Sequence, residues 1–567
     1  MDNIQIAPAS AQFWKLVEDE WEFRMQAEPL LATMTGDHRY DDRLPNVSES
    51  DVARRLDRMH EFRQRGRVID RAALTSAERL NYDIFVRLLE NEIREIEFRA
   101  YRMPLSKTGG FHTEFPELHA FMPLDTLKDY ENYVARLDAF SRYVADNIEV
   151  MRAGLDGGQI PPRTTLEGVA DTLRPHIVET SAQSQLFKPF EQFPKTIDET
   201  EQRRLIEAGG AAIMGSVVPG YRALLKFVEG EYLPASRGDI AAASLPNGRE
   251  FYAHRIRYFC SLDLSPEEIH TTGLSEVERI RAEMQDILRK TKFEGDMRAF
   301  IEFLRTDPRF YAETPDALLK ETAYILKRID GELPRLFKTL PRMSYGIRPI
   351  PDFAAPGNTT AYYFPASGDG MRAGVYYVNT FDLKSRPFYE IEALSLHEAV
   401  PGHHLQIALQ QELDLPKFRR FGGFTSFVEG WALYAERLGL EIGFYQDPYS
   451  DFGRLSYEMW RACRLVVDTG MHALGWTRQQ AIDFMAENTS STLLNITNEI
   501  DRYIAWPGQA LAYKIGERKI RELRAGAEQA LGPRFNLREF HDVVLGSGAV
   551  PLDVLENMVA EWIHQRQ

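Results

Sequence analysis

The stretch SLHEAVPGHHLQ, residues 395–406, brings histidine and glutamate together in a pattern that proteins use to bind metal ions. His397 is followed directly by Glu398, and His403 and His404 come shortly afterwards. In the zinc-binding pattern His-Glu-x-x-His, the two histidines lie one helical turn apart and share one ion, while the glutamate faces a water on that ion. Here a proline occupies the place of the second histidine, so the pattern is present with an altered spacing.

The geometry of a straight helix does not bring a second histidine back to the first. An ideal helix turns His403 about 240° away from His397, and it places His404 on the right face but roughly 10.5 Å along the axis. Pro401 removes a helical hydrogen bond and Gly402 tolerates unusual backbone angles, so a bulge of two residues would let His403 take the ligand position. His404 would then point in a neighbouring direction, toward substrate. The alternative is that the Pro-Gly pair ends a helix and the histidines cap its last carbonyls.

A third ligand is expected from the next helix, GGFTSFVEGWALYAERLGLEIG, residues 422–443. Glu429 lies 26 residues after His403, a separation that suits a ligand from an adjacent antiparallel helix. The competing reading is structural, because Ser426 and Glu429 have the S-x-x-E spacing of a capping box. Glu436, two turns further on the same face, is the alternative ligand or the partner of a ligating histidine.

Residues 344–380 differ from the rest of the chain. The runs SYGIRPIP, TTAYYFPA and AGVYYVNT are rich in Tyr, Val and Ile and are separated by Pro, Gly and Asp. They predict a small antiparallel β-sheet beside the metal-site helix. Its last strand would offer an exposed edge to an extended peptide, with Tyr377 in contact with substrate. A purely structural hairpin is the alternative.

The remaining sequence is mostly helical in pattern. Residues 51–66, 75–100 and 265–290 carry apolar residues at i, i+3, i+4 and i+7 on otherwise charged faces, which is typical of packed amphipathic helices. Ser265 and Glu268 form an expected capping box at the start of the third helix. The sequence therefore predicts a mainly α protein.

The length of 567 residues exceeds what one compact core usually holds. We expect two helical lobes, residues 1–240 and 241–567, which form one continuous body. The second lobe would hold the sheet and the zinc site at residues 397–436. The oligomeric state is left open.

Composition limits the partners and the location. A hydrophobic fraction of 44% and a charged fraction of 27% are ordinary for a soluble globular protein. The net charge of −16, without a basic cluster, argues against a nucleic-acid partner. The first residues lack a basic segment followed by an apolar one, and no window nears 18 uninterrupted apolar residues, so neither a membrane partner nor export is expected. We therefore expect a cytoplasmic protein in which Cys260 and Cys463 are buried free thiols.

Four segments resemble a known family: HEAVPGHHLQ, FVEGWALYAERLG, RACRLVVDTGMHALGW and YIAWPGQALAYKIGERKI. They are similar to the bacterial proteins of unknown function numbered 885, which are grouped with the gluzincin metallopeptidases. LPNGREFY and LSPEEIHTTGLSEVERIRAEM, before the sheet, look like earlier signatures of the same family. The likeness is strongest over residues 240–520, and we expect it to extend over the whole chain.

More distantly, the arrangement is similar to that of thimet-type oligopeptidases, carboxypeptidase Taq and angiotensin-converting enzyme. This resemblance implies a bilobal helical gluzincin-like metallopeptidase with a deep central cleft. Their ligand motif reads Gly-His, which corresponds to Gly402 and His403 here. Tyrosines near their C-terminal end bind the tetrahedral intermediate, and the resemblance makes Tyr513 the first candidate for that role and Tyr503 the second.

Three residues of the segment RACRLVVDTGMHALGW are weaker candidates. His472 and Arg464 would contact substrate, and Asp468 stands one helical turn after Arg464. An Arg and Asp at this spacing usually form a structural ion pair.

These assignments describe one reaction. Zn²⁺ held by His397, His403 and Glu429 would leave a position open for water and polarise the scissile carbonyl. Glu398 would take the proton of the water and pass it to the leaving amine, while Tyr513 donates to the oxyanion. The predicted function is zinc-dependent hydrolysis of peptide bonds in short peptides, of the oligopeptidase or carboxypeptidase type. The alternatives are a metal-dependent hydrolase or tailoring enzyme acting on a small non-peptide amide, and a catalytically inactive metal-binding protein.

Overall fold

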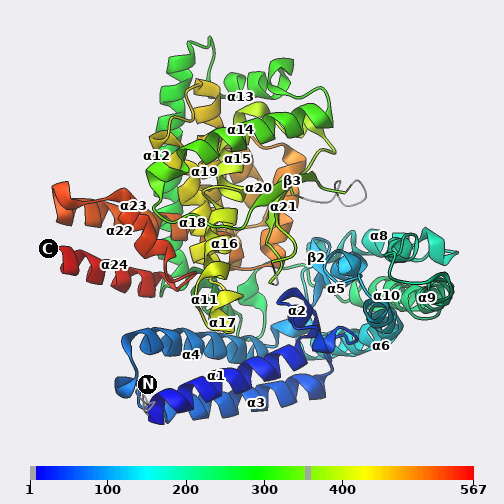
Figure 1. Ribbon diagram of the computed structural model, residues 1–567. Coiled ribbons are helices and arrows are strands. Elements are labelled where there is room, and N and C mark those ends of the chain that lie inside the picture. The colour runs from blue at the N-terminus through cyan, green and yellow to red at the C-terminus, as the bar shows by residue number, and fades with distance from the viewer. Residues whose placement is uncertain (1–7, 352–354, 356–358, 369) are drawn as a thin grey trace. The chain divides into compact units, whose positions relative to one another are not determined.

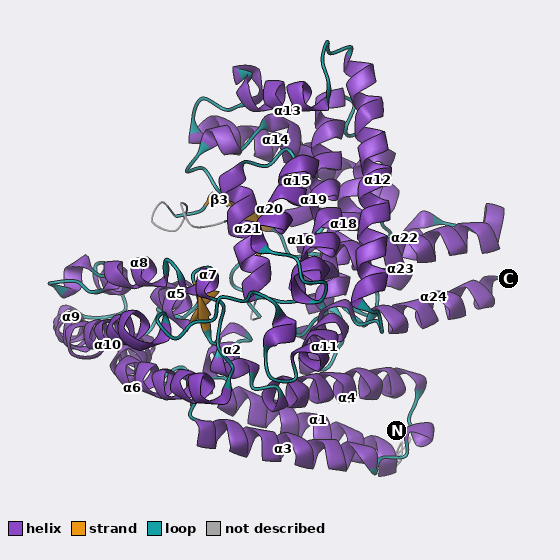
Figure 2. Ribbon diagram, turned by 180° about the vertical axis from the view of Figure 1, so that it is seen from behind, coloured by secondary structure: helices purple, strands orange, loops and turns teal. Residues whose placement is uncertain are grey.

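The computed structural model describes residues 8–351, 355, 359–368 and 370–567. The chain is helical nearly throughout, which confirms the prediction of a mainly α protein (Figures 1 and 2). It divides into two compact units, Met1–Asp239 with Ser244–Asn247 and Ile240–Ala243 with Gly248–Gln567. The deep central cleft implied by the family resemblance depends on how the two units are placed relative to each other, so it stays a prediction.

The first unit is built from helices of very different lengths. The predicted helices of residues 51–66 and 75–100 form α3 and α4, and α4 begins with a capping box made by Thr75 and Glu78. Its core gathers Tyr133, Phe140 and other aromatic side chains around α6. The helices are α1 (Pro8–Ala27), α2 (Pro29–Met34), α3 (Glu49–Arg67), α4 (Ser76–Glu97), α5 (Phe111–Glu114), α6 (Leu127–Gly157), α7 (Arg163–Leu166), α8 (Val169–Leu173), α9 (Glu199–Ala212) and α10 (Val218–Phe227), with the short strands β1 (Leu105–Ser106) and β2 (Gly109–Gly110).

One helical stretch of this unit, Glu199–Tyr232, is long and apolar enough to cross a membrane by length and composition, with a mean hydropathy of 1.2. However, 56% of the 18-residue segment that has this hydropathy is buried inside the structure. It packs against α6, and Val217, Tyr221 and Leu224 belong to the core. Packing within the unit therefore accounts for its apolar residues.

The second unit is a set of long helices in which α12 lies along α19 and α18 lies between α15 and α22 (Figure 1). A β-carbon on Gly430 of α18 would stand 2.5 Å from Cα of Gly516 of α22, so these two helices touch through their backbones. The helices are α11 (Gly248–Cys260), α12 (Pro266–Thr291), α13 (Met297–Thr306), α14 (Pro315–Leu336), α15 (Phe388–Glu398), α16 (His403–Glu412), α17 (Lys417–Arg420), α18 (Thr425–Leu438), α19 (Pro448–His472), α20 (Arg478–Asn488), α21 (Leu493–Ala505), α22 (Ala512–Leu531), α23 (Leu537–Leu545) and α24 (Leu552–Arg566).

Two local predictions for this unit are confirmed. Ser265 and Glu268 make the expected capping box at the start of α12. Cys260 and Cys463 are both buried and free.

The small sheet differs from its prediction in two ways. Its strands are β3 (Tyr345–Pro349), β4 (Ala361–Phe364) and β5 (Gly374–Val378), in the order β3-β5-β4. β4 and β5 are antiparallel, but β3 and β5 are parallel, so the expectation of an antiparallel sheet is wrong.

The last strand is also not an exposed edge. β5 lies in the centre and uses both of its edges to pair with β3 and β4, so it cannot add a peptide strand. The residues of β5 other than Tyr377 are buried, which is typical of a central strand. Tyr377 stacks on Tyr362 of the neighbouring strand, with ring centres 5.0 Å apart. Its predicted contact with substrate, which depended on an exposed β5 edge, loses that basis.

Candidate metal centre

The altered spacing is resolved by a break between two helices. α15 ends at Glu398 and α16 begins at His403, so residues 399–402 belong to neither helix. The Val400–Pro401 peptide in this break is cis. The expectation of a two-residue bulge in one helix is therefore wrong, because the chain leaves the first helix and enters a second one.

Two contacts hold the break in place. A β-carbon on Gly402 would stand 1.9 Å from the carbonyl oxygen of His397, so only glycine fits there. The indole Nε1 of Trp431, on α18, donates to the carbonyl oxygen of Pro401 at 2.8 Å. The start of α16 is thereby set against the end of α15 and the side of α18.

This arrangement brings the three predicted ligands together. Oε2 of Glu429 lies 3.7 Å from Nε2 of His397 and 3.4 Å from Nε2 of His403. One ligand atom from each of the three residues lies within 4.8 Å of the others. Two ligands on a tetrahedral zinc ion, each about 2.0–2.1 Å from it, are separated by roughly 3.4 Å. The separations of Glu429 from the two histidines are therefore close to those in a zinc site.

The state of the ligand atoms supports the same reading. Oε2 of Glu429 is buried and makes no hydrogen bond within the described part of the chain. The side chains of His397, His403 and Glu429 are 4%, 12% and 19% exposed, so the group is recessed but not sealed. Burial alone would raise the pKa of Glu429, but the two histidines outweigh it and hold that pKa well below its usual value.

Glu436 orients the first of the two histidines. Its Oε1 lies 2.8 Å from Nδ1 of His397, which leaves Nε2 to face Glu429. Arg461 of α19 lies 3.6 Å from the same carboxylate oxygen. A carboxylate on the second nitrogen of a ligating histidine fixes the ring and increases its basicity. Of its two anticipated roles, Glu436 takes that of a histidine partner.

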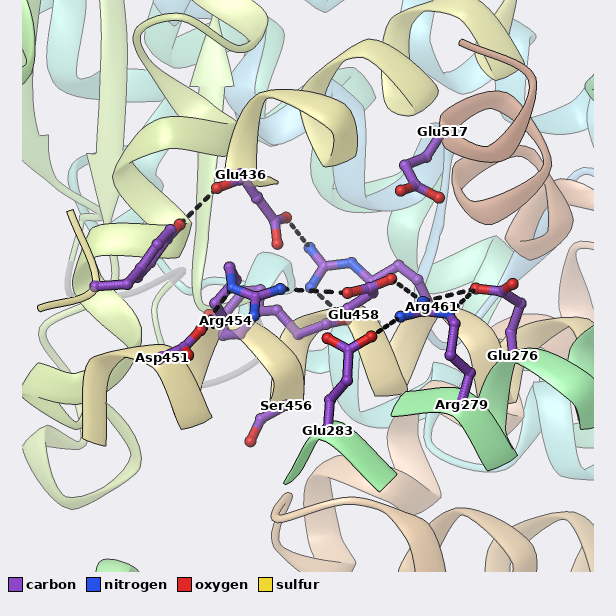
Figure 3. A network of polar contacts seen from close by, with 12 residues as sticks. Glu276, Arg279, Glu283, Glu436, Asp451, Arg454, Ser456, Glu458, Arg461 and Glu517 are labelled. Carbon is purple, nitrogen blue, oxygen red and sulfur yellow. Dashed lines mark hydrogen bonds and ion pairs between the residues drawn. The ribbon is translucent and has the colours of Figure 1, made fainter. Parts of the chain in front are cut away.

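A larger charged network lies beside the contact between Glu436 and Arg461 (Figure 3). The fully buried ammonium of Lys514 lies 2.7 Å from Glu458 and 3.2 Å from Glu276, so it joins α22, α19 and α12. Removing one member of such a buried network would leave the other charges unpaired and would destabilise the contact among these three helices.

The capping alternative for Glu429 is excluded by the start of α18. The N-cap of this helix is Phe424, which makes no side-chain cap. Ser426 is instead within 2.9 Å of the hydroxyl of Ser261. Glu429 therefore has no capping role and its carboxylate faces the histidines.

His404 does not face the metal site. Its Nε2 donates to the carbonyl oxygen of Met343 at 3.1 Å, and its Nδ1 accepts from the hydroxyl of Tyr363 at 2.9 Å. The side chain is buried and ties α16 to the sheet segment. Its predicted contact with substrate is wrong, because both ring nitrogens are already engaged inside the protein.

Glu398 is the last residue of α15 and directly follows His397. It is 8% exposed. Its negative charge adds to burial in raising the pKa of Tyr376 on β5, and it stands one residue after the predicted ligand His397. This position leaves it available for the proton transfer expected from the sequence.

Tyr513 lies within electrostatic range of one predicted ligand. The phenol is close enough to Glu429 that the charge of this carboxylate adds to burial in raising the pKa of Tyr513. The guanidinium carbon of Arg464 stands 4.5 Å from the centre of the Tyr513 ring. The structure thus brings the first tyrosine candidate within electrostatic range of Glu429 and packs Arg464 against its ring.

Tyr503 is used inside the core. Its hydroxyl accepts hydrogen bonds from Nε of Arg464 at 2.7 Å and from the indole of Trp460 at 3.0 Å, and it donates to Glu499 at 2.6 Å. With 1% exposure and these partners it cannot reach an oxyanion, so its candidacy as a catalytic group is wrong.

His472 and Asp468 are structural as well. The Nδ1 of His472 accepts from the backbone of Ala242 at 3.1 Å and its Nε2 donates to the carbonyl of Tyr503 at 3.0 Å, so its predicted contact with substrate is wrong. Asp468 accepts from the hydroxyl of Tyr252 at 2.6 Å rather than pairing with the arginine one turn before it.

Sequence reasoning missed the partner of that arginine. Arg464 pairs with Glu499, whose Oε2 lies 3.2 Å from its Nη2, and the same oxygen lies 2.9 Å from Nη2 of Arg502. The only signal in the sequence is the spacing of Glu499, Arg502 and Tyr503, three and four residues apart on one helix face.

The comparisons with known proteins agree with the sequence motifs. The model of a family of bacterial proteins of unknown function, numbered 885, matches residues 29–559. The chain belongs to this family. No curated protein matches it.

Three solved structures were matched to this chain, with very different degrees of similarity. A "putative lipoprotein" from Colwellia psychrerythraea is 30% identical, with a TM-score of 0.94 over 99% of this chain and 100% of that chain. A "putative lipoprotein of unknown function" from Shewanella oneidensis is 18% identical, with a TM-score of 0.74 over 97% and 99%, and shows the fold alone. A "putative oligoendopeptidase F" from Bacillus anthracis str. Ames is 12% identical over 92% and 96%, with a TM-score of 0.29, which is too low to support a common fold.

The first two structures correct the predicted location. Both proteins are described as "putative" lipoproteins, a class that is attached to a membrane or secreted, and the first is 30% identical to this chain over 99% of its length. The expectation of a cytoplasmic protein rested on the residues near position 1 and is contradicted by this finding.

Proposed function

We propose that this protein is a zinc metallopeptidase that hydrolyses peptide bonds in short peptides. The observation that carries the proposal is the convergence of His397, His403 and Glu429, with ligand atoms within 4.8 Å of one another, directly beside Glu398. A site that only stored a metal would need no further carboxylate next to its ligands. When bound, zinc would supply Lewis-acid chemistry, which acidifies a water molecule and polarises a carbonyl.

The side chains of the protein would perform the remaining steps. Glu398 would accept the proton of the attacking water and return it to the leaving amine. Glu436 would keep the ring of His397 in its ligating orientation through the 2.8 Å contact to Nδ1. The hydroxyl of Tyr513, which is not fully buried, would donate to the oxyanion that forms on the carbonyl.

The test combines metal analysis with digestion of a mixed peptide library, with and without a chelator. We expect one zinc per chain, cleavage of short peptides, loss of cleavage with the chelator and recovery on adding zinc back. A stably folded protein should stay intact, because the recessed triad requires an extended substrate. Stoichiometric zinc without cleavage of any peptide would refute peptidase activity and favour a small non-peptide amide as the substrate. Absence of zinc would refute the metal centre itself.

A further inference from the structure

A positively charged cluster packs against Tyr513, the proposed oxyanion donor. Arg464 and Arg502 both pair with one carboxylate, that of Glu499. Within the described part of the chain, neither arginine forms an ion pair with another residue. The hydroxyl of Tyr503 donates to this carboxylate and is uncharged. The cluster therefore carries one positive charge more than its ion pairs balance.

One donor of this cluster is left without an acceptor. Nη1 of Arg464 is buried and makes no hydrogen bond to any described residue, although Nε and Nη2 are both engaged. The residue is 4% exposed. A buried charged donor without an acceptor is costly, and such a group is usually satisfied by a partner that the protein itself does not provide.

The position of the unpaired donor points toward the reaction. The guanidinium of Arg464 lies against the face of Tyr513, and the charge of Glu429 acts on that tyrosine. The guanidinium carbon of Arg464 stands 4.5 Å from the centre of the ring whose hydroxyl is the proposed oxyanion donor. A group held by Arg464 would therefore belong to a substrate residue near the scissile bond, one or two residues away, because two residues of extended chain span at most about 7 Å.

We propose that Arg464 binds the free C-terminal carboxylate of the substrate, so that this protein removes one or two residues from the C-terminal end of short peptides. The inference rests on the proposed function and adds the substrate class to it. A planar guanidinium with free donors matches a carboxylate better than any other group of a peptide. Side-chain carboxylates have the same chemistry, but the aromatic rings of Trp460, Tyr503 and Tyr513 enclose Arg464, which suits the end of a chain rather than a continuing one.

The first test uses the wild-type, zinc-loaded protein and needs no variant. One peptide is compared as its free acid, as its C-terminal amide, and as the amide with a glutamate as its last residue. We expect kcat/KM for the free acid to exceed that for the amide by roughly 30-fold or more, which is what the loss of a buried charge contact costs. Equal cleavage of acid and amide would overturn the inference and leave the peptidase proposal standing. If the terminal glutamate restores cleavage of the amide fully, a side-chain carboxylate is the ligand and the inference fails.

The second test assigns the effect to the arginine. Arg464→Gln should lose the preference for the free acid, mainly through KM, and Arg464→Lys should keep part of it. Arg524→Gln removes an arginine that pairs with Glu441 and Glu528 at the other end of α22, and it should keep the full preference. A preference unchanged in Arg464→Gln would contradict the assignment.

The third test does not depend on catalysis. Titration calorimetry measures the binding of 3-phenylpropanoate and of its amide to the zinc-loaded wild type and to Arg464→Lys. Arg464→Lys is used here because it retains a positive charge and replaces Arg464→Gln if that variant does not fold. We expect the acid to bind the wild type at least about ten-fold more tightly than the amide and to weaken in the variant at unchanged zinc content. Equal affinities of acid and amide, or an affinity that the variant does not change, would rule out the carboxylate site even if peptides are cleaved.

Discussion

The carbonyl oxygen of His397 lies 1.9 Å from the point at which a β-carbon on Gly402 would stand. Because the obstacle is backbone and not a flexible side chain, a larger residue at position 402 must push α15 and α16 apart. His403, the first residue of α16, would then move away from His397 and Glu429.

The first prediction follows from this contact. Gly402→Ala should lower the free energy of unfolding by about 1–3 kcal/mol and weaken zinc binding, because it forces the two ligand helices apart. Gly331→Ala is the matched control, since nothing lies within 4 Å of the added carbon in α14 and a helical alanine there should be neutral or slightly stabilising. Denaturant unfolding and zinc titration measure both effects. Normal zinc affinity in Gly402→Ala would show that the break is not what positions His403.

The second prediction separates the two adjacent histidines. His403→Ala should lose stoichiometric zinc, whereas His404→Ala should keep it and lose roughly 1–3 kcal/mol of stability, because the Met343 carbonyl and the Tyr363 hydroxyl lose their buried partner. Zinc content by elemental analysis and thermal unfolding give the two readouts. Loss of zinc in His404→Ala alone would reverse the assignment of the second ligand.

The third prediction tests the general base. Glu398→Gln retains the size of the side chain and removes its basic site, so zinc content and thermal stability should stay near wild type. Turnover of a short peptide should fall by about 10²–10⁴. A variant that hydrolyses peptides at the wild-type rate would disprove the role of Glu398 and the mechanism built on it.

The fourth prediction concerns the partner of His397. Glu436→Gln keeps an oxygen near Nδ1 but loses the negative charge, and it leaves Arg461 without its carboxylate. We expect the zinc Kd to rise by about 10- to 100-fold, as is usual when such a partner is changed. Glu441→Gln, which breaks the surface pair with Arg524, should leave the zinc Kd unchanged. Similar affinities in the two variants would mean that Glu436 does not orient the ligand.

The fifth prediction is a pH dependence of stability. Burial raises the pKa of Asp468 to about 7, against the lowering effects of the Tyr252 hydroxyl, the Gly508 amide and the charges of Arg255 and Arg502. Since the folded protein binds this proton more tightly than the unfolded chain, the free energy of unfolding should fall as pH rises from about 4 to about 7. Asp468→Asn cannot lose a proton and should flatten this part of the curve. Parallel curves for the two proteins in urea unfolding from pH 4 to 8 would show that Asp468 does not carry the effect.

Local features of the site could be read from the sequence. Residue type, spacing and the family resemblance single out one group: His397, Glu398, His403 and Glu429. Metal binding allows few residue types, and Pro401 with Gly402 predicts that the helix is interrupted. Their meeting point could not be derived, because it depends on α18 and on the indole of Trp431, which anchors the break from a distant part of the chain.

The sequence by itself determined the helical class, the capping box of Ser265 and the two buried thiols, since each follows from periodicity, from neighbouring residues or from the isolation of a residue type. Only the tertiary structure decided that β5 is a central strand, that Tyr503 and His472 are core residues, and that Arg464 pairs with Glu499 instead of Asp468. A side chain at a helix edge carries the same local signal whether it faces a site or the core. Its hydrogen-bond partners come from helices far away in the chain, and only the packing of those helices determines which groups are left free to act on a substrate.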